Sequence, residues 1–343
     1  MRAQPDRIEK VVIPGGAGYV GTRLVPRLLR EGYRVTVYDA LFFGAEGLDL
    51  THPRLELVEG DVRDTRRFAE ACDDVDAVVH LAQVADGTRV VDPEDFEALV
   101  RVARLAGARR FILSSAFALP RPTGWLWGQA DDDGRAPLGG LELDEARQCE
   151  SLLLAHHDDD FTCTALRPAI PCGQAPRQRF DLIVNAMAHL AFVEGEVVVP
   201  RLPVSGPHLH VDDVCRAYQA LLTAPVDAVG ERVWDSEGEY FSMDEMARLV
   251  QSIVEREASD VECSDVQGQA SETAGSAELD SDRLGQALGF VPEKSVAEAI
   301  RDLTRAFGEG AFPDSMHDDR YFNVRALKSL HGAGLARRDS SAA

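Results

Sequence analysis

Short apolar runs alternate with helical patterns along the first half of the chain. The apolar runs predict β-strands at residues 11–13, 33–38, 55–58, 76–82, 110–115 and 161–167. Apolar residues at helical spacing predict helices at residues 22–30, 93–105 and 141–157. Strands and helices that alternate over short connections form a parallel sheet with helices on both faces. The pattern therefore predicts an α/β protein with a doubly wound parallel (Rossmann) sheet, which binds ligands at the carboxyl ends of its strands.

Three glycines lie directly between the first predicted strand and the first predicted helix. Gly15 permits a tight turn, Gly18 lets a pyrophosphate approach the backbone, and Gly21 lets the helix pack closely on the strand. The free N–H groups at the helix start then attract phosphates. An ordinary strand-to-helix turn can show the same glycines, but the second strand ends at Asp39, where a carboxylate can hold the hydroxyls of the adenosine ribose. Because this carboxylate would repel a 2′-phosphate, the pattern predicts NAD rather than NADP.

Composition and charge narrow the choice of partners. The chain has 343 residues and a formal net charge of -22, which argues against nucleic acid and an anionic membrane surface as partners. No apolar run is long enough to span a bilayer, and the polar residues 1–10 lack the core of a signal peptide, so we expect a cytoplasmic protein. The six cysteines are scattered and form no Cys-x-x-Cys pair, which predicts neither disulfides nor a metal site.

Six short motifs along the chain have counterparts in one enzyme family. They are the glycine turn at residues 14–21, Asp61-Val62, His80-Leu81-Ala82, the Leu166-Arg167-Pro168 strand end, His210-Val211-Asp212 and the late segment at residues 281–292. Together they resemble the extended short-chain dehydrogenases/reductases of the NAD-dependent epimerase/dehydratase group. The resemblance covers nearly the whole chain, and residues 318–324 resemble the ending of some sugar-modifying members.

The resemblance implies a cofactor domain, a smaller C-terminal substrate domain and a set of NAD contacts. We expect the NAD-binding domain at residues 1–173, with part of 207–235 returning to it. The substrate domain would comprise residues 174–206 and 236–330, before a frayed tail at 331–343. The expected cofactor-binding residues are Gly15, Gly18, Tyr19, Val20, Gly21, Asp39, Asp61, Val62, Leu81, Ala82, Ser114 and Pro168.

The family's two-helix contact also implies a homodimer. In the resembled family, two long helices of each subunit pair across a twofold axis, and such closed pairing is the common symmetry for enzymes of this kind. Here residues 95–105 and 141–157 would supply that face. The expected apolar contacts include Leu99, Val102, Leu152 and Leu153.

The chain departs from the family in its catalytic residues. The family uses a Tyr-x-x-x-Lys pair on the helix after the fifth strand, in which the lysine lowers the tyrosine pKa and holds the nicotinamide ribose. Aligned on Glu150, this chain has Glu142 in place of the tyrosine and Ala146 in place of the lysine, and no tyrosine is followed by a lysine four residues on. Ser115 matches the family's catalytic serine, although a hydroxyl at a strand end can also be purely structural.

Two further side chains are candidates for acid/base work. Glu142 could donate or accept a proton if an apolar pocket raised its pKa, or it could be a solvated acid at a helix start. His208 could titrate near neutral pH, or it could be a polar wall residue. Nucleotide-sugar members often carry an arginine four residues before the histidine of the His-Val-x-Asp element. Here that position is Gly206, which weakens the case for a nucleotide sugar unless Arg177 or Arg201 substitutes.

Two classes of function fit these residues. The first is an atypical NAD-dependent enzyme that oxidises, epimerises or dehydrates a hydroxyl-bearing small molecule, such as a sugar nucleotide or a secondary metabolite. The second is a non-redox protein on the same fold, which catalyses a cyclisation or isomerisation or only binds a ligand, with NAD structural or absent. The intact glycines and Asp39 favour retained NAD, whereas the missing tyrosine and lysine favour lost hydride transfer. We favour the enzyme.

Overall fold

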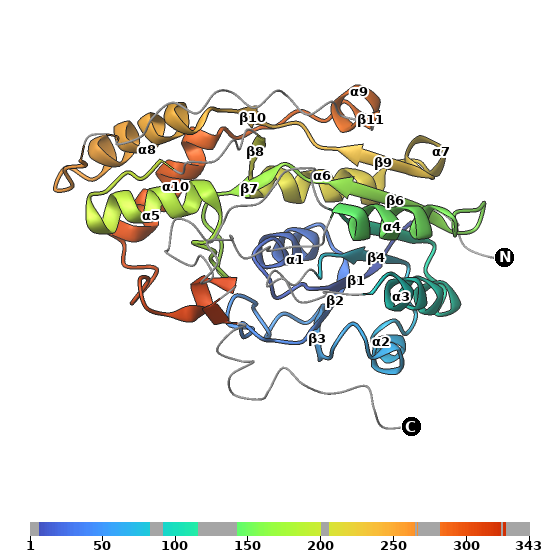
Figure 1. Ribbon diagram of the computed structural model, residues 1–343. Coiled ribbons are helices and arrows are strands. Elements are labelled where there is room, and N and C mark those ends of the chain that lie inside the picture. Colours follow the sequence, from blue (N-terminus) through green and yellow to red (C-terminus); the bar gives the residue numbers. More distant parts are fainter. Residues whose placement is uncertain are drawn as a thin grey trace.

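The computed structural model describes residues 7–82, 92–115, 143–199, 206–264, 266, 282–323 and 325–326. Its main sheet has eight parallel strands within these ranges, in the order β11-β9-β6-β5-β4-β1-β2-β3 (Figure 1). The strand order reverses between β1 and β4, so the carboxyl ends of these two strands border the crevice where doubly wound sheets bind ligands. The strands are β1 (Lys10–Pro14), β2 (Arg34–Asp39), β3 (Leu55–Glu59), β4 (Ala77–His80), β5 (Arg110–Ser114), β6 (Thr162–Arg167), β9 (Arg232–Asp235) and β11 (Asp282–Arg283).

Helices cover both faces of the main sheet, as the alternating pattern predicts. Side chains of β1 alternate between the two faces: Val11 and Ile13 pack on one side, and Val12 packs on the other. The helices α1 (Gly21–Arg30) and α6 (Val211–Thr223) complete the first core. The helices α2 (Thr65–Ala71), α3 (Pro93–Leu105) and α4 (Leu143–Leu154) lie over the second. The doubly wound sheet is confirmed.

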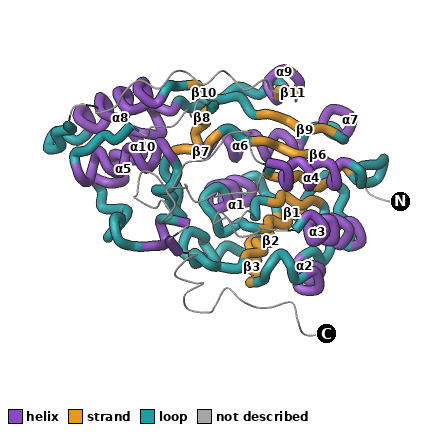
Figure 2. Tube along the Cα trace, in the orientation of Figure 1, coloured by secondary structure: helices purple, strands orange, loops and turns teal. Residues whose placement is uncertain are grey.

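A second lobe has its own apolar core beside the carboxyl ends of the strands (Figure 2). Three helices form it: α5 (Ile183–Glu194), α8 (Met243–Glu257) and α10 (Val296–Gly308). Beside them lies a small sheet of β7 (Ile170–Cys172), β8 (Pro207–His210) and β10 (Glu239–Tyr240). The remaining short elements are α7 (Val226–Val229), α9 (Leu284–Leu288) and η2 (Asp319–Tyr321). In contrast to the domain limits expected above, β11 joins the main sheet, because Leu284 and Phe290 pack into the core beneath α6.

Two of the four residues expected at a dimer contact lie inside the subunit. Leu99 on α3 and Leu153 on α4 are both 0% exposed and belong to the core between these helices and the sheet. A side chain with no exposed surface in one subunit cannot contact a second one, so these two assignments are wrong. Val102 and Leu152 are half-buried and keep an exposed part.

No helix in the described parts of the chain is both long and apolar enough to cross a bilayer.

Candidate cofactor site and active site

The glycine turn after β1 is built as a phosphate site requires. The Gly15 N–H donates a hydrogen bond to the Tyr38 carbonyl oxygen at 2.9 Å, and its φ of +80° is left-handed. A Cβ on Gly15 would lie 2.5 Å from the Ala82 backbone nitrogen at the end of β4. A Cβ on Gly21 would lie 2.3 Å from the Gly16 carbonyl oxygen. Both positions therefore need glycine for the strand, the turn and the helix to pack together.

Gly18 is less crowded. A Cβ there would have one contact within 4 Å among the described residues, 3.1 Å from the Gly15 carbonyl oxygen, which is tighter than most Cβ contacts but longer than those at Gly15 and Gly21. Helix α1 follows with no side-chain cap within the described chain and no acid in its first turn. An uncapped helix start leaves N–H groups and a positive dipole end for an anion. This geometry fits the pyrophosphate of a dinucleotide.

Asp39 lies at the end of β2, beside this turn. Its carboxylate accepts hydrogen bonds from the Ala17 N–H at 3.0 Å and the Leu41 N–H at 2.9 Å, which fix both of its oxygens. Burial raises the pKa of Asp39, and the two backbone N–H groups and the Arg177 guanidinium oppose that shift. The carboxylate is thus held where the adenosine ribose of a dinucleotide would lie.

The other expected cofactor contacts follow the same edge of the sheet. Asp61 comes after β3 and is paired through both carboxylate oxygens with Arg63. Leu81 continues β4 and donates its N–H to the Pro14 carbonyl oxygen at 2.8 Å. Ser114 ends β5, where its hydroxyl accepts a hydrogen bond from Tyr218 at 2.6 Å. The edge also includes Val20 in the glycine turn, Val62 after Asp61, Ala82 after Leu81 and Pro168 after β6.

Tyr19 points from the glycine turn toward the second lobe. It is buried, and its hydroxyl donates to the Gly173 carbonyl oxygen at 2.6 Å. The Asn185 side chain donates to the same hydroxyl at 3.2 Å. The Tyr19 side chain therefore connects the glycine turn to the start of α5 and has a structural role. The Tyr19 backbone remains part of the glycine turn.

Ser115 is part of a buried charged cluster. Its hydroxyl donates to Glu150 Oε1 at 2.5 Å, across from β5 to α4. Arg167 binds both carboxylate oxygens of Glu150, with Nε–Oε1 at 2.7 Å and Nη2–Oε2 at 2.6 Å. Burial raises the pKa of Glu150, while the Ser115 hydroxyl and Arg147 act in the opposite direction. The cluster fixes the Ser115 oxygen at the strand end and leaves its lone pairs as acceptors.

The position aligned with the family's lysine is occupied by a buried methyl group. Ala146 lies one turn before Glu150 on α4 and is 1% exposed. No ammonium group can act from this position. Glu142, aligned with the tyrosine, lies outside the described residues.

His208 lies on β8 and is fully buried. Neither of its ring nitrogens has a hydrogen-bond partner within the described residues. Burial lowers its pKa to about 4, so the ring is neutral at physiological pH. The neutral-range titration that made it a candidate is therefore absent in this structure.

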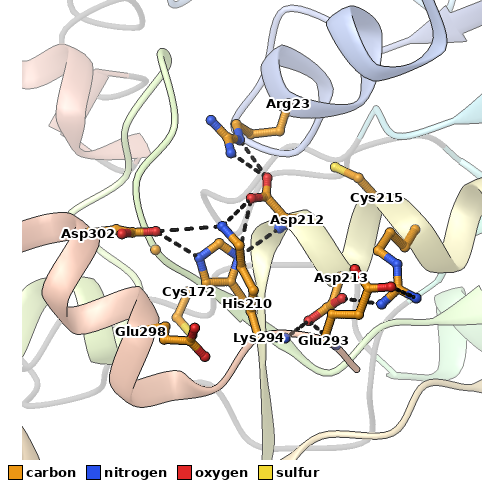
Figure 3. Close-up of polar contacts among 12 residues, drawn as sticks. Arg23, Cys172, His210, Asp212, Asp213, Cys215, Glu293, Lys294, Glu298 and Asp302 are labelled. Atoms are coloured by element: carbon orange, nitrogen blue, oxygen red, sulfur yellow. Dashed lines mark hydrogen bonds and ion pairs between the residues drawn. The ribbon is translucent and has the colours of Figure 1, made fainter. Parts of the chain in front are cut away.

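An ionic junction around Asp212 ties the cofactor helix to the second lobe (Figure 3). The Asp212 carboxylate pairs with Arg23 Nε of α1 at 2.8 Å and with Lys294 Nζ at 2.8 Å. His210 caps α6 by accepting the Asp212 N–H at its Nδ1, while its Nε2 lies 3.4 Å from Asp302 of α10. His210 therefore has a structural role, because it caps its own helix and lies beside Asp302 of α10.

Arg177, considered above as a phosphate ligand, is engaged elsewhere. It is 7% exposed, lies against the Phe43 ring and donates to the Asn323 side chain. Arg201 lies outside the described residues.

Comparisons with known proteins agree with this site. Residues 11–235 match the NAD dependent epimerase/dehydratase family. The chain is 33% identical over 264 residues to a 3 beta-hydroxysteroid dehydrogenase/Delta 5→4-isomerase of Mycobacterium tuberculosis, covering 70% of this chain and 68% of that protein. It is 32% identical over 123 residues to a UDP-glucose 4-epimerase of Klebsiella pneumoniae, covering 31% and 88%.

Solved structures share the fold. A dTDP-glucose 4,6-dehydratase from Streptomyces venezuelae, with NAD and TYD bound, superposes with a TM-score of 0.68 over 90% of this chain and 99% of that chain, at 20% identity. A UDP-N-acetylglucosamine 4-epimerase from Methanobrevibacter ruminantium superposes with a TM-score of 0.67 over 89% and 99%, at 19% identity. The cofactor of this chain is NAD. The chain belongs to the NAD-dependent epimerase/dehydratase family.

Proposed function

We propose that this protein is an NAD-dependent enzyme that acts on a hydroxyl-bearing small molecule without the usual tyrosine–lysine pair. The observation that carries the proposal is the contrast between an intact cofactor turn and the buried Ala146 on α4. Bound NAD supplies a reversible hydride acceptor. The chain's own residues must then hold the substrate hydroxyl and move its proton.

Ser115 is the proposed hydroxyl-positioning residue. Because its own proton is donated to Glu150, its oxygen is available to accept a hydrogen bond from a substrate hydroxyl. Arg167 holds Glu150 in place through two hydrogen bonds, so the Ser115 oxygen is rigidly positioned.

Glu142 is the proposed acid/base. A carboxylate is a much weaker base than a tyrosinate, so its pKa must rise through burial for it to take a proton near neutral pH. His208 is the reserve candidate, disfavoured by the lowered pKa of its buried ring.

The substrate we favour is an uncharged secondary alcohol. Gly206 offers no guanidinium to a diphosphate, and Arg177 is held by Phe43 and Asn323. The relative matched over 264 residues is a hydroxysteroid dehydrogenase/isomerase, whereas the UDP-glucose epimerase matches over 123. Nucleotide sugars are the second class to be tested.

The test follows nicotinamide absorbance while the protein and NAD are mixed with 3β-hydroxysteroids, UDP-glucose or dTDP-glucose. A steroid substrate should reduce NAD, and Glu142→Gln should lower turnover at least about tenfold with unchanged NAD affinity. Glu145→Gln, three residues further along the chain, is the matched control and should retain activity. An active protein unimpaired by Glu142→Gln would exclude this assignment. Activity without any nicotinamide signal, indifferent to the oxidation state of the cofactor, would instead support the non-redox alternative.

A further inference from the structure

Arg177 is a buried cation with no carboxylate oxygen within 4 Å in the described part of the chain, and the buried carboxylate that acts on it most, Asp181, is paired with Arg179. The side chain is 7% exposed, and its Nε has no hydrogen-bond partner among the described residues. Its Nη2 donates to the neutral Asn323 side chain at 2.5 Å. Burial lowers the pKa of Arg177 to about 9. Since burying an unpaired charge is unfavourable, this arginine needs an explanation in terms of what surrounds it.

Its surroundings are the borders of the adenosine end of the NAD site. The guanidinium carbon lies 4.0 Å from the centre of the Phe43 ring, in the loop that follows Asp39. The Arg177 backbone N–H donates to the Thr22 hydroxyl in the first turn of α1 at 3.3 Å. The same loop approaches again at Gly47, where a Cβ would lie 3.3 Å from the Arg177 nitrogen. Arg177 therefore contacts both α1, whose start would bind the pyrophosphate, and the loop after Asp39, the residue that would bind the ribose.

Arg177 also acts on the Asp39 charge. Burial raises the pKa of Asp39, and Arg177 is the charged side chain that opposes it. Among the other charges near this end, Asp181 is buried and paired with Arg179. Glu59, beside Asp39 in the sheet, is exposed, and Glu46 lies 3.8 Å from Arg320 at the surface. A partly buried carboxylate with a guanidinium nearby stays ionised to lower pH than one without.

We propose that Arg177 is a positioning residue for NAD, which clamps the loop after β2 through Phe43 and so holds the Asp39 carboxylate where it can accept the ribose hydroxyls. The Asn323 side chain, from the segment that follows η2, holds the guanidinium in this place. The inference concerns cofactor affinity and is independent of the reaction proposed above.

Titration calorimetry with NAD tests this role in a double-mutant cycle of Arg177→Met and Asp39→Asn. Arg177→Met should weaken NAD binding about tenfold near neutral pH, and its affinity should begin to fall at a higher pH than that of the wild type. When Asp39 is already replaced by asparagine, Arg177→Met should weaken NAD binding by less than about twofold. Arg101→Met, which removes an exposed arginine of α3 paired with Glu97 on the same helix, is the matched control and should bind NAD normally.

Arg177→Lys keeps the positive charge but loses the planar guanidinium that lies over the Phe43 ring, so it distinguishes the effect of the charge from that of the ring contact. It should lose part of the affinity but retain the wild-type pH profile, and it serves where Arg177→Met does not fold. Wild-type affinity and pH profile in Arg177→Met would overturn the proposal. An equal loss in both Asp39 backgrounds, or a shifted pH profile in Arg177→Lys, would also overturn it. These readouts report binding alone, so a failure of the proposed reaction would leave them unchanged.

Discussion

Gly18 differs from Gly15 and Gly21 in how closely the protein's own backbone surrounds it. Adding a side chain at Gly15 or Gly21 would collide with the protein's own backbone, whereas a Cβ at Gly18 would make one tight contact, 3.1 Å from the Gly15 carbonyl oxygen. Its backbone faces the place where the pyrophosphate would lie. A side chain at Gly18 should therefore disturb the cofactor more than the fold.

The Gly18→Val variant should fold with some loss of stability, because its Cβ presses on the Gly15 carbonyl oxygen, and should lose NAD binding. The valine side chain would occupy the approach of the pyrophosphate to the turn. Thermal unfolding and calorimetry on the same sample measure both properties. Gly308→Ala, where a Cβ meets nothing within 4 Å, is the control and should leave NAD binding intact. Tight NAD binding by Gly18→Val would show that the dinucleotide does not cross this turn.

Individual site residues differ in how far the sequence could reveal them. Gly15 and Asp39 were predictable because their requirements are local to one strand–turn–helix unit. Arg177 was not, since Thr22, Phe43 and Asn323 come to it from remote parts of the chain. The burial of His208, which lowers its pKa, likewise depends on packing that a single strand pattern does not contain.

At the level of elements, the Asp212 junction connects α1, α6 and α10. Asp212 is paired with Arg23 and Lys294, and its side chain is only 22% exposed. An ion pair whose carboxylate is shielded from solvent to this extent contributes more to the free energy of unfolding than a fully exposed ion pair does. The junction should therefore stabilise the contact between the cofactor helix and the second lobe.

The Asp212→Ala variant should unfold about 1–2 kcal/mol more easily, because two cations lose their shared partner. Urea unfolding measures this difference. Glu70→Ala is the matched control, since its pair with Arg67 on α2 is exposed on both sides and should contribute nothing measurable. Equal stability of the two variants would mean that the junction does not hold the lobes together.

Element positions were predicted well where periodicity was strong and less well elsewhere. The helix at 93–105 has the expected limits, and the helix expected at 141–157 is Leu143–Leu154 in the described chain. Leu99 and Leu153 were misassigned because an apolar helical stripe looks the same whether it meets the core or a partner subunit. The homodimer stays a prediction that light scattering at micromolar concentration can check.

On the scale of the whole molecule, three buried histidines link stability to pH. Burial lowers the pKa of His80, His189 and His208 to about 4. The unfolded chain takes up these protons near pH 6.5, whereas the folded protein does not until about pH 4. Their contribution is therefore fully present above pH 6.5 and is lost as the pH falls through this window.

Urea unfolding between about pH 7 and pH 5 should show this loss. The free energy of unfolding should fall by up to about 1.4 kcal/mol per pH unit for each proton that only the unfolded chain binds. His80→Leu replaces a ring packed between Phe96 and Phe111 and should make the decline shallower. A decline of the same slope in His80→Leu would exclude His80 as a source, and stability independent of pH in this range would exclude all three.

The overall architecture was accessible from the sequence because alternating strands and helices allow few arrangements. The second lobe was harder to delimit, since its helices come from three separated stretches and β11 returns to the main sheet. The catalytic residues were harder to predict from the sequence than the fold. The tyrosine and lysine that mark them in the resembled family align here with Glu142 and Ala146.

The glycine turn and Asp39 should form a working NAD site, and calorimetric titration of the wild-type protein with NAD and with NADP measures this. The half-buried Asp39 carboxylate should accept the two ribose hydroxyls and repel a 2′-phosphate, so NAD should bind at least about tenfold more tightly than NADP. Equal affinity for the two dinucleotides, or binding of neither, would show that this edge of the sheet is not an NAD site.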